Sequence, residues 1–244
     1  MRKILQTLIL LYCTTTFSAD LQPALRIAVP HFTPPYVMQG YKNNVTGFDI
    51  VMLTRICDYM RVKCKFVPMS TDDLLQAVAD QQADLAVGAL AITLAGYQKV
   101  NFSMPYLLSN VRFLGLSAQQ KWSPTYKNAK IGVTAGGEFP AELTPMANMP
   151  KKIISFQHST QMIDALNKGN IDLALMDNAT TIYWQNHSSG KFIAVGKQFS
   201  LGFGLGIAVN LDNVALVKAV NAAILKYEST PEFKELYSMY FDSI

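Results

Sequence analysis

One pattern of the sequence occurs twice, and it limits the folds that the chain can adopt. Around residues 71–87 a predicted helix leads through a short turn into a strand that opens on Asp84-Leu85-Ala86. Around residues 160–175 the same order returns, with a strand that opens on Asp172-Leu173-Ala174. Strands separated by helices of this length form parallel βαβ units. The repeat therefore predicts an α/β protein of two lobes with a cleft between them, unless these short runs recur by accident.

Hydrophobic patterns predict the elements of both halves. Ligand sites in open parallel sheets lie at the carboxyl ends of the strands, so both lobes would direct their sites into the cleft. In the first half we expect strands over 25–29, 65–68 and 85–88, and helices over 48–60 and 72–79 with N-cap candidates at 70–72. In the second half we expect strands over 130–133, 152–156 and 171–176, and helices after Gly137 and over 162–168.

The first residues indicate export from the cytoplasm. Arg2 and Lys3 precede an apolar run that is too short to span a bilayer, and small residues follow near Ser18-Ala19. We take residues 1–19 as a signal peptide, with cleavage after Ser18 as an alternative. A lipoprotein signal at Cys13 is the weaker alternative, because the bulky Tyr12 precedes the cysteine. No later segment is apolar for long enough to cross a membrane.

The net charge limits the classes of partner that the chain can have, and the cysteines indicate a disulfide. Removal of residues 1–19 deletes two cations and no anion, so the net charge falls from +4 to +2, which argues against nucleic acid as a partner. Two cysteines remain, Cys57 and Cys64, with no histidine near them. In an exported chain this pair predicts a disulfide rather than a metal site. The closed loop has about eight residues, so the expected stabilisation is ~2–3 kcal/mol.

The segment over residues 84–106, DLAVGALAITLAGYQKVNFSMPY, resembles the ligand-binding segment of the periplasmic solute-binding proteins of the amino-acid class. Ile92-Thr93, Phe102-Ser103 and Pro105-Tyr106 fall in the register of that family. The turn at 32–36, the Gly-Phe-Asp-Ile at 47–50 and the closing helices extend the resemblance over residues 24–244. It implies a bilobal fold, shared with the ligand cores of ionotropic glutamate receptors, and no cofactor.

The resemblance also implies the division of the chain and its surroundings. Lobe 1 would comprise residues 20–112 and 204–244, lobe 2 residues 113–195, and residues 196–203 a second crossover. The Gly-rich run at 202–206 suits a hinge, or else a flexible surface loop. Such a protein would be a monomer in the periplasm that delivers a small molecule to an ABC permease in the inner membrane.

The ligand site departs from the family pattern. The family holds the ligand's α-carboxylate with an arginine, and this chain has Gly96 at that position. Hydroxyl groups are missing at Ala89 and Ala91, and the second-lobe turn reads Gly136-Gly137-Glu138. Glu138 would place an anion where a helix N-terminus usually receives a carboxylate, although it could equally be solvated. Thr93 is retained, but we expect it to be the N-cap of a helix that begins near Leu94.

Asp177 is retained where the family binds the ligand's α-amino group, although an Asp at a strand end is often only a turn residue. Phe32, Tyr36 and Tyr106 could wall the pocket, or pack in the core. Asp49 is interpreted as a helix N-cap. The sequence therefore predicts a site for a cationic or neutral ligand without an α-carboxylate. As an alternative, one of three cations restores the clamp: Lys99, Arg112 or Lys197.

No catalytic or metal-binding set is recognised, since the three histidines are scattered and no nucleophile or phosphate-binding motif occurs. We therefore expect a binding protein rather than an enzyme. Two alternatives remain: a degenerate sensor or partner-binding receptor without a transport role, and an enzyme like the cyclohexadienyl dehydratases. The missing arginine argues against the second.

Overall fold

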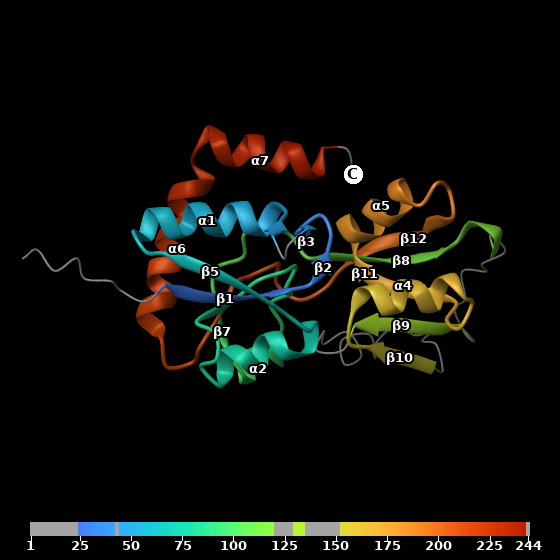
Figure 1. The fold of residues 1–244 in the computed structure, drawn as a ribbon, viewed down its shortest axis with the longest axis horizontal. Coiled ribbons are helices and arrows are strands. Elements are labelled where there is room, and N and C mark those ends of the chain that lie inside the picture. Colours follow the sequence, from blue (N-terminus) through green and yellow to red (C-terminus); the bar gives the residue numbers. More distant parts are fainter. Residues whose placement is uncertain (1–23, 42–43, 120–128, 135–151, 243–244) are drawn as a thin grey trace, which may run out of the picture.

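The computed structural model describes residues 24–41, 44–119, 129–134 and 152–242. The predicted signal peptide, Gly137 and Glu138 lie outside the described residues. Two α/β bodies lie side by side, one built around β1 and one around β9 (Figure 1). The predicted bilobal α/β fold is confirmed. No helix in the described part of the chain is long and apolar enough to cross a membrane.

The sheet of the first lobe has the order β5-β1-β6-β13-β7. β1 pairs in parallel with both β5 and β6, as the βαβ pattern predicts, while β13 pairs antiparallel with β6 and β7. The last strand of the chain thus returns to the sheet of the first. The strands are β1 (Leu25–Pro30), β5 (Cys64–Met69), β6 (Leu85–Ala86), β7 (Asn101–Phe102) and β13 (Ala208–Val209).

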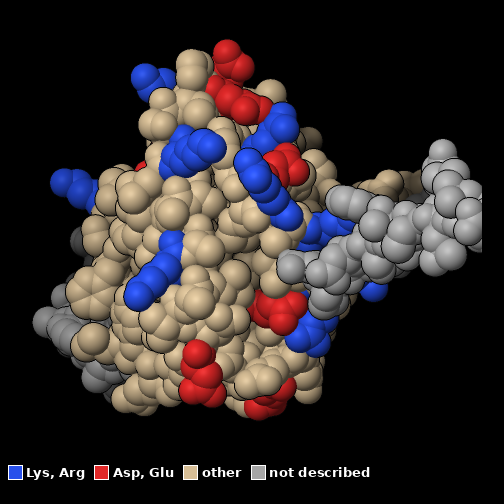
Figure 2. Space-filling model, turned by 90° about the vertical axis from the view of Figure 1, so that its left-hand side faces the viewer, with Lys and Arg blue, Asp and Glu red and all other residues tan. Residues whose placement is uncertain are grey.

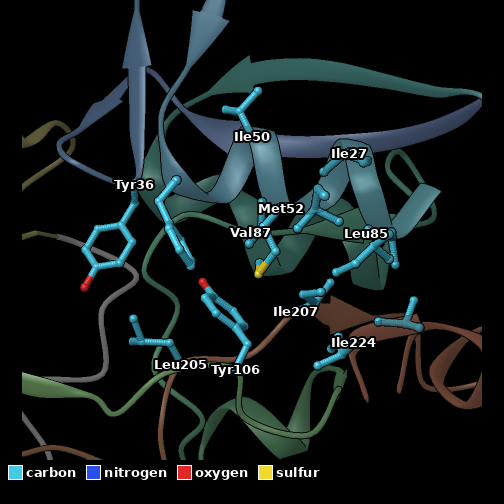
Figure 3. Packing of buried hydrophobic residues seen from close by; sticks show 14 of the residues in the cluster. Ile27, Tyr36, Ile50, Met52, Leu85, Val87, Tyr106, Leu205, Ile207 and Ile224 are labelled. Carbon is cyan, nitrogen blue, oxygen red and sulfur yellow. The ribbon is translucent and has the colours of Figure 1, made fainter. Parts of the chain in front are cut away.

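The helices of the first lobe cover both faces of its sheet. The helices α1, α6 and α7 lie on one face and α2 on the other (Figure 1). Figure 3 shows the core on the first face, where Ile27, Leu85, Ile207 and Ile224 lie together and Tyr36 stands at one edge. These helices are α1 (Phe48–Met60), α2 (Leu74–Ala79), α6 (Val214–Glu228) and α7 (Pro231–Phe241).

The second lobe has the sheet order β10-β9-β11-β8-β12, with α4 and α5 packed against it (Figure 1). β9 pairs in parallel with β10 and β11, which repeats the parallel core of the first lobe. The elements are β8 (Asn110–Leu116), β9 (Lys130–Thr134), β10 (Lys152–Phe156), α4 (Ser159–Asn167), β11 (Leu173–Asp177), α5 (Asn178–His187) and β12 (Phe192–Ser200). A small third sheet contains β2 (Phe32–Thr33), β3 (Val37–Gln39) and β4 (Val45–Thr46), and three short 3-10 turns lie at Thr71–Asp73, Gly96–Gln98 and Ser117–Gln119.

The glycine-rich run after β12 is tightly packed. Gly202 has φ 63°, and a Cβ there would lie 2.2 Å from the Ile92 carbonyl oxygen. The Phe203 N–H donates to that same carbonyl, and the Ile92 N–H donates to the Gly204 carbonyl. Only glycine fits this conformation at this approach of two backbones. The run is therefore not a loose surface loop, and its role as a hinge stays a prediction.

The face in Figure 2 belongs to the end of the molecule that the first lobe forms. Lysine and arginine side chains are interspersed there with aspartate and glutamate. On the described atoms of this face no broad patch of one sign is seen. A surface of mixed sign offers no extended match to a polyanion.

The Cys57–Cys64 disulfide is formed, with a Cα–Cα distance of 6.3 Å, and it joins the end of α1 to the start of β5. We expect replacement of both cysteines by alanine to lower the free energy of unfolding by ~2–3 kcal/mol, because the unfolded chain gains loop entropy. Urea unfolding of the oxidised protein and of the double variant measures the difference. Equal midpoints in urea would contradict the expectation.

Candidate functional site

A cleft of about 90 Å³ lies between the two lobes. From the first lobe it is lined by Thr33, Thr71, Leu75 and residues 88–91 and 93. From the second lobe it is lined by Thr134, Ser159, Met162, Met176, Asp177 and Thr180. Leu201, which follows β12, also lines it. Several of these residues stand at or just beyond the carboxyl ends of parallel strands, where open α/β sheets place ligand sites.

Asp177 is the one charged residue among the described residues that line the cleft. It ends β11 and caps α5: its Oδ1 atom accepts from the N–H groups of Ala179 at 2.8 Å and Thr180 at 3.4 Å. The Tyr36 hydroxyl donates to the same oxygen at 2.9 Å. Burial raises the pKa of Asp177 to about 6, and these hydrogen bonds oppose the rise because they favour the carboxylate. The residue is thus a helix cap and also a carboxylate that faces the cleft.

The Tyr36–Asp177 hydrogen bond also joins the lobes, since Tyr36 lies in the core of the first. A second link runs from the Ser159 hydroxyl, at the start of α4, to the Phe32 carbonyl at 2.5 Å. His31 and His158 meet edge to face, with ring centroids 5.6 Å apart. The structure therefore represents an arrangement in which the two lobes are in contact.

The predicted aromatic wall is not among the described residues that line the cleft. The Phe32 ring packs against Tyr183 and Trp184 of α5, at centroid distances of 6.4 and 6.1 Å. Tyr36 is 3% exposed and packs in the core, with only its hydroxyl reaching Asp177. Thr33 lines the cleft instead, because neighbouring strand residues point to opposite sides.

Ala89, Ala91 and Thr93 line the cleft, and their part in ligand binding stays a prediction. Thr93 also caps the following turn, because its Oγ1 accepts from the Gly96 N–H at 3.1 Å. The first-lobe wall therefore presents the methyl groups of Ala89 and Ala91 beside threonines, of which Thr93 has a hydroxyl that is already hydrogen-bonded. Gly137 and Glu138 lie outside the described residues, so their place in the site stays a prediction.

Gly96 is buried, and its surroundings are filled. A Cβ at this position would lie 2.8 Å from Cε2 and 3.0 Å from Cζ of Phe102. Contacts this short force the neighbouring ring to move. An arginine at position 96 therefore requires a different packing of Phe102. Glycine at position 96, in place of the family's arginine, thus goes together with the close packing of Phe102 in the first lobe.

The three cations proposed as substitutes for the missing arginine lie away from the cleft in this structure. Arg112 donates from Nε to the Gly196 carbonyl at 2.9 Å, and with Lys197 it lines a separate depression next to β12. Lys99 is exposed on the first lobe. None of the described residues that line the cleft is a lysine or an arginine. The described part of the cleft therefore carries negative charge only.

Asp49 has a different role from the predicted N-cap, and that interpretation was wrong. Gly47 is the N-cap residue of α1, whereas Asp49 lies inside the helix and is fully buried. Its Oδ2 accepts from the Tyr106 hydroxyl at 3.0 Å and from the Ala89 N–H at 3.1 Å. Ala89 has φ 56°, an uncommon conformation for a residue with a side chain, and this bond holds it in the cleft wall. Burial raises the pKa of Asp49 to about 7.

Thr180 is a cleft residue that the sequence interpretation missed. It lies three residues after Asp177 on α5, so both side chains face the same side of the helix. Its hydroxyl is buried and has no hydrogen-bond partner within the described part of the chain. An unpaired buried hydroxyl costs free energy. The spacing Asp-x-x-Thr at the start of a helix was the signal available in the sequence.

The described residues contain no group of three or more His, Cys, Asp or Glu side chains that could hold a metal ion. The candidate site is thus a small interlobe cleft whose described lining has one carboxylate, several threonine side chains, apolar side chains and the buried, unpartnered hydroxyl of Thr180. Such a site can bind a small ligand that carries a positive charge or a hydrogen-bond donor.

Comparisons with known proteins agree with this architecture. The family model of bacterial extracellular solute-binding proteins, family 3, matches residues 25–243. An arginine-binding periplasmic protein of Mannheimia haemolytica is 29% identical over 242 residues, which cover 97% of each chain. ABC transporter arginine-binding protein 1 of Escherichia coli K12 is 25% identical over 234 residues, 95% of this chain and 96% of the relative.

Among solved structures, an arginine 3rd transport system periplasmic binding protein from Legionella pneumophila is similar, with a TM-score of 0.85 and 27% identity. The match covers 90% of this chain and 100% of that one. The family model spans nearly the whole chain, and the structure has the bilobal fold with a cleft between its lobes. This chain belongs to the bacterial extracellular solute-binding proteins, family 3.

Proposed function

We propose that this protein is an exported, non-enzymatic receptor that captures a small organic cation, or a neutral polar solute, without a free α-carboxylate. It works as a monomer in the periplasm and delivers its ligand to an ABC importer. Lobe 1 comprises residues 20–112 and 204–244, lobe 2 residues 113–195, and the lobes close about a second crossover at 196–203. The observation that carries the ligand class is that Asp177 is the one charged residue among the described lining residues of the cleft.

Charge decides the ligand class. A carboxylate buried beside apolar walls attracts an ammonium or guanidinium group much more strongly than it would in water. A ligand's own carboxylate would meet Asp177 with no described cation on the walls to balance it. Leaving that carboxylate unpaired in the cleft costs free energy. An amine without a carboxylate avoids this cost.

The relatives support one half of this proposal. Those from Mannheimia haemolytica and Escherichia coli are named as arginine-binding proteins, and arginine carries a guanidinium cation. A preference of this protein for a cationic ligand agrees with the names of these relatives. The second half, rejection of the α-carboxylate, rests on Gly96 and on the packing of Phe102 against it.

A thermal-shift screen tests the proposal. It should compare amino acids, their decarboxylated amines, short peptides and cyclohexadienyl acids. We expect some of the amines to raise the melting temperature, because a ligand that binds only the folded protein stabilises it. A separate assay of the product tests for turnover of a cyclohexadienyl acid, and turnover would make the protein an enzyme. If no compound shifts the melting temperature, a receptor without a transport role replaces the proposal.

Binding of a cationic ligand should weaken in acid. The ligand needs the ionised form of Asp177, whose pKa is about 6, so affinity is full above that pH and falls below it. From pH 7.5 to pH 5 the ionised fraction falls about tenfold, and the apparent dissociation constant rises by the same factor. Calorimetric titrations at the two pH values measure this change. Affinity that stays constant or improves in acid would argue against a role for the Asp177 carboxylate.

A further inference from the structure

A second and larger cavity lies between the lobes. Its volume is about 540 Å³, within the range of small-molecule sites. It is bounded by α7, by the start of α5 and by the segment 105–110 that leads into β8. Figure 1 shows the C-terminal end of α7 beside α5. We call this cavity the aromatic groove, after five of its lining residues: Tyr36, Tyr106, Phe203, Tyr237 and Phe241.

The aromatic groove and the cleft have one described lining residue in common, Asp177. Tyr36, which donates to Asp177, lines the groove and not the cleft. The hydrogen-bonded pair therefore stands between the two cavities. A group that pairs with the Asp177 carboxylate from the groove changes the charge that the cleft presents.

The groove has the chemistry of a site for an organic cation. Aromatic ring faces attract cations, and the groove adds the carboxylate of Asp177. None of its described lining residues is a lysine, arginine or histidine. Asn178 also lines the groove, and its buried Oδ1 atom has no hydrogen-bond partner in the described part of the chain. An ammonium group can donate to both side chains.

Three exposed apolar side chains gather on the rim of the groove. Leu108 is 82% exposed, Phe203 63% and Tyr237 41%, and all three line this one cavity. Exposed apolar side chains that gather in a concave place mark binding sites more often than ordinary surface. The rim therefore suits the apolar body of a ligand whose charged end points to Asp177.

We propose that the aromatic groove is a second ligand site, which binds a small primary ammonium carrying an aromatic or branched apolar body. Its occupation lowers the affinity of the cleft for a cation, because both ligands need the Asp177 carboxylate. By linkage, a cleft ligand lowers the affinity of the groove by the same factor. The proposal of a groove site depends only on the residues that line the groove, whereas the coupling rests on the proposed function of the cleft.

Phenethylammonium is the probe, compared by calorimetry with its neutral counterpart 2-phenylethanol and with phenylacetate. We expect the ammonium to bind at least tenfold more tightly than the alcohol, and phenylacetate not to bind. Tyr237→Ala should weaken the ammonium at least tenfold. Met239→Ala is the matched control, because Met239 is 74% exposed on the same helix and does not line the groove. Equal binding of the three probes, or no binding, overturns the proposal.

A variant that fills the cleft separates the two sites. Thr71 lines the cleft and not the groove. Thr71→Trp should therefore change the dissociation constant of phenethylammonium by less than about threefold relative to the wild type. Loss of phenethylammonium in Thr71→Trp, with no loss in Tyr237→Ala, would place the probe in the cleft and overturn the groove site. Failure of the cleft proposal looks different: agmatine, the decarboxylated form of arginine, does not bind, while phenethylammonium still binds the groove. A groove ligand that leaves the affinity of a cleft amine unchanged would refute the coupling alone.

Discussion

Asp177→Asn is expected to weaken the binding of a cationic ligand in the cleft by a hundredfold or more. The substitution keeps the shape of the side chain and removes its charge. Asparagine is also a good N-cap, and its oxygen can still accept from Tyr36 and from the N–H groups of α5. The fold should therefore survive. A charge-assisted hydrogen bond in a buried site accounts for a loss of this size, ~3 kcal/mol.

Calorimetry on the wild type, Asp177→Asn and a control measures this effect. Asp164→Asn is the control, because Asp164 also lies in the second lobe but is exposed and paired with Lys168. It should leave the affinity unchanged. Melting curves of the three proteins check that each is folded. Less than a threefold loss in Asp177→Asn would mean that the carboxylate does not hold the ligand.

Gly96→Arg is expected to destabilise the fold by ~3 kcal/mol without creating a site for amino acids. The new Cβ would lie 2.8 Å from the Phe102 ring, so either the ring or the turn at 96–98 must shift. Overpacking of this kind costs about 1–3 kcal/mol, and a guanidinium forced into a buried position adds to the cost. The effect should appear as a lower midpoint in urea.

Ala95→Arg is the matched control, since Ala95 is the exposed neighbour of Gly96 and should tolerate the same side chain within ~0.5 kcal/mol. Gly96→Arg combined with Phe102→Leu should recover part of the lost stability, because a smaller side chain makes room. A Gly96→Arg protein as stable as the wild type that binds arginine tightly would show that the site kept its family geometry.

The elements of the fold were predictable because their signals are local. The helix expected over 48–60 is α1 at those bounds, and the strand over 152–156 is β10. Element ends were less accurate. The helix over 162–168 begins earlier, at Ser159, and the helix over 72–79 opens with a 3-10 turn. None of the proposed caps at 70–72 makes a side-chain cap bond in the described structure.

The site was harder to predict, because it depends on which way each side chain points. In the turn at 32–36, the sequence left open whether Phe32 and Tyr36 wall the pocket or pack in the core; in the structure Thr33 lines the cleft and Tyr36 lines the neighbouring groove. The orientation follows from packing of Phe32 on α5, a contact between residues more than 150 positions apart. Asp49 was misread for a similar reason, since its partners Ala89 and Tyr106 come from distant segments. Asp177 was singled out as a candidate because a strand end and a family position coincide there.

The central claim is that the cleft selects against an α-carboxylate. Agmatine and arginine carry the same guanidinium and differ by that carboxylate, so the ratio of their dissociation constants tests the claim directly. Calorimetry on the unmutated protein at pH 7.5 should give agmatine an affinity at least tenfold higher than that of arginine. Micromolar or tighter binding of arginine, with agmatine weaker, would contradict the account.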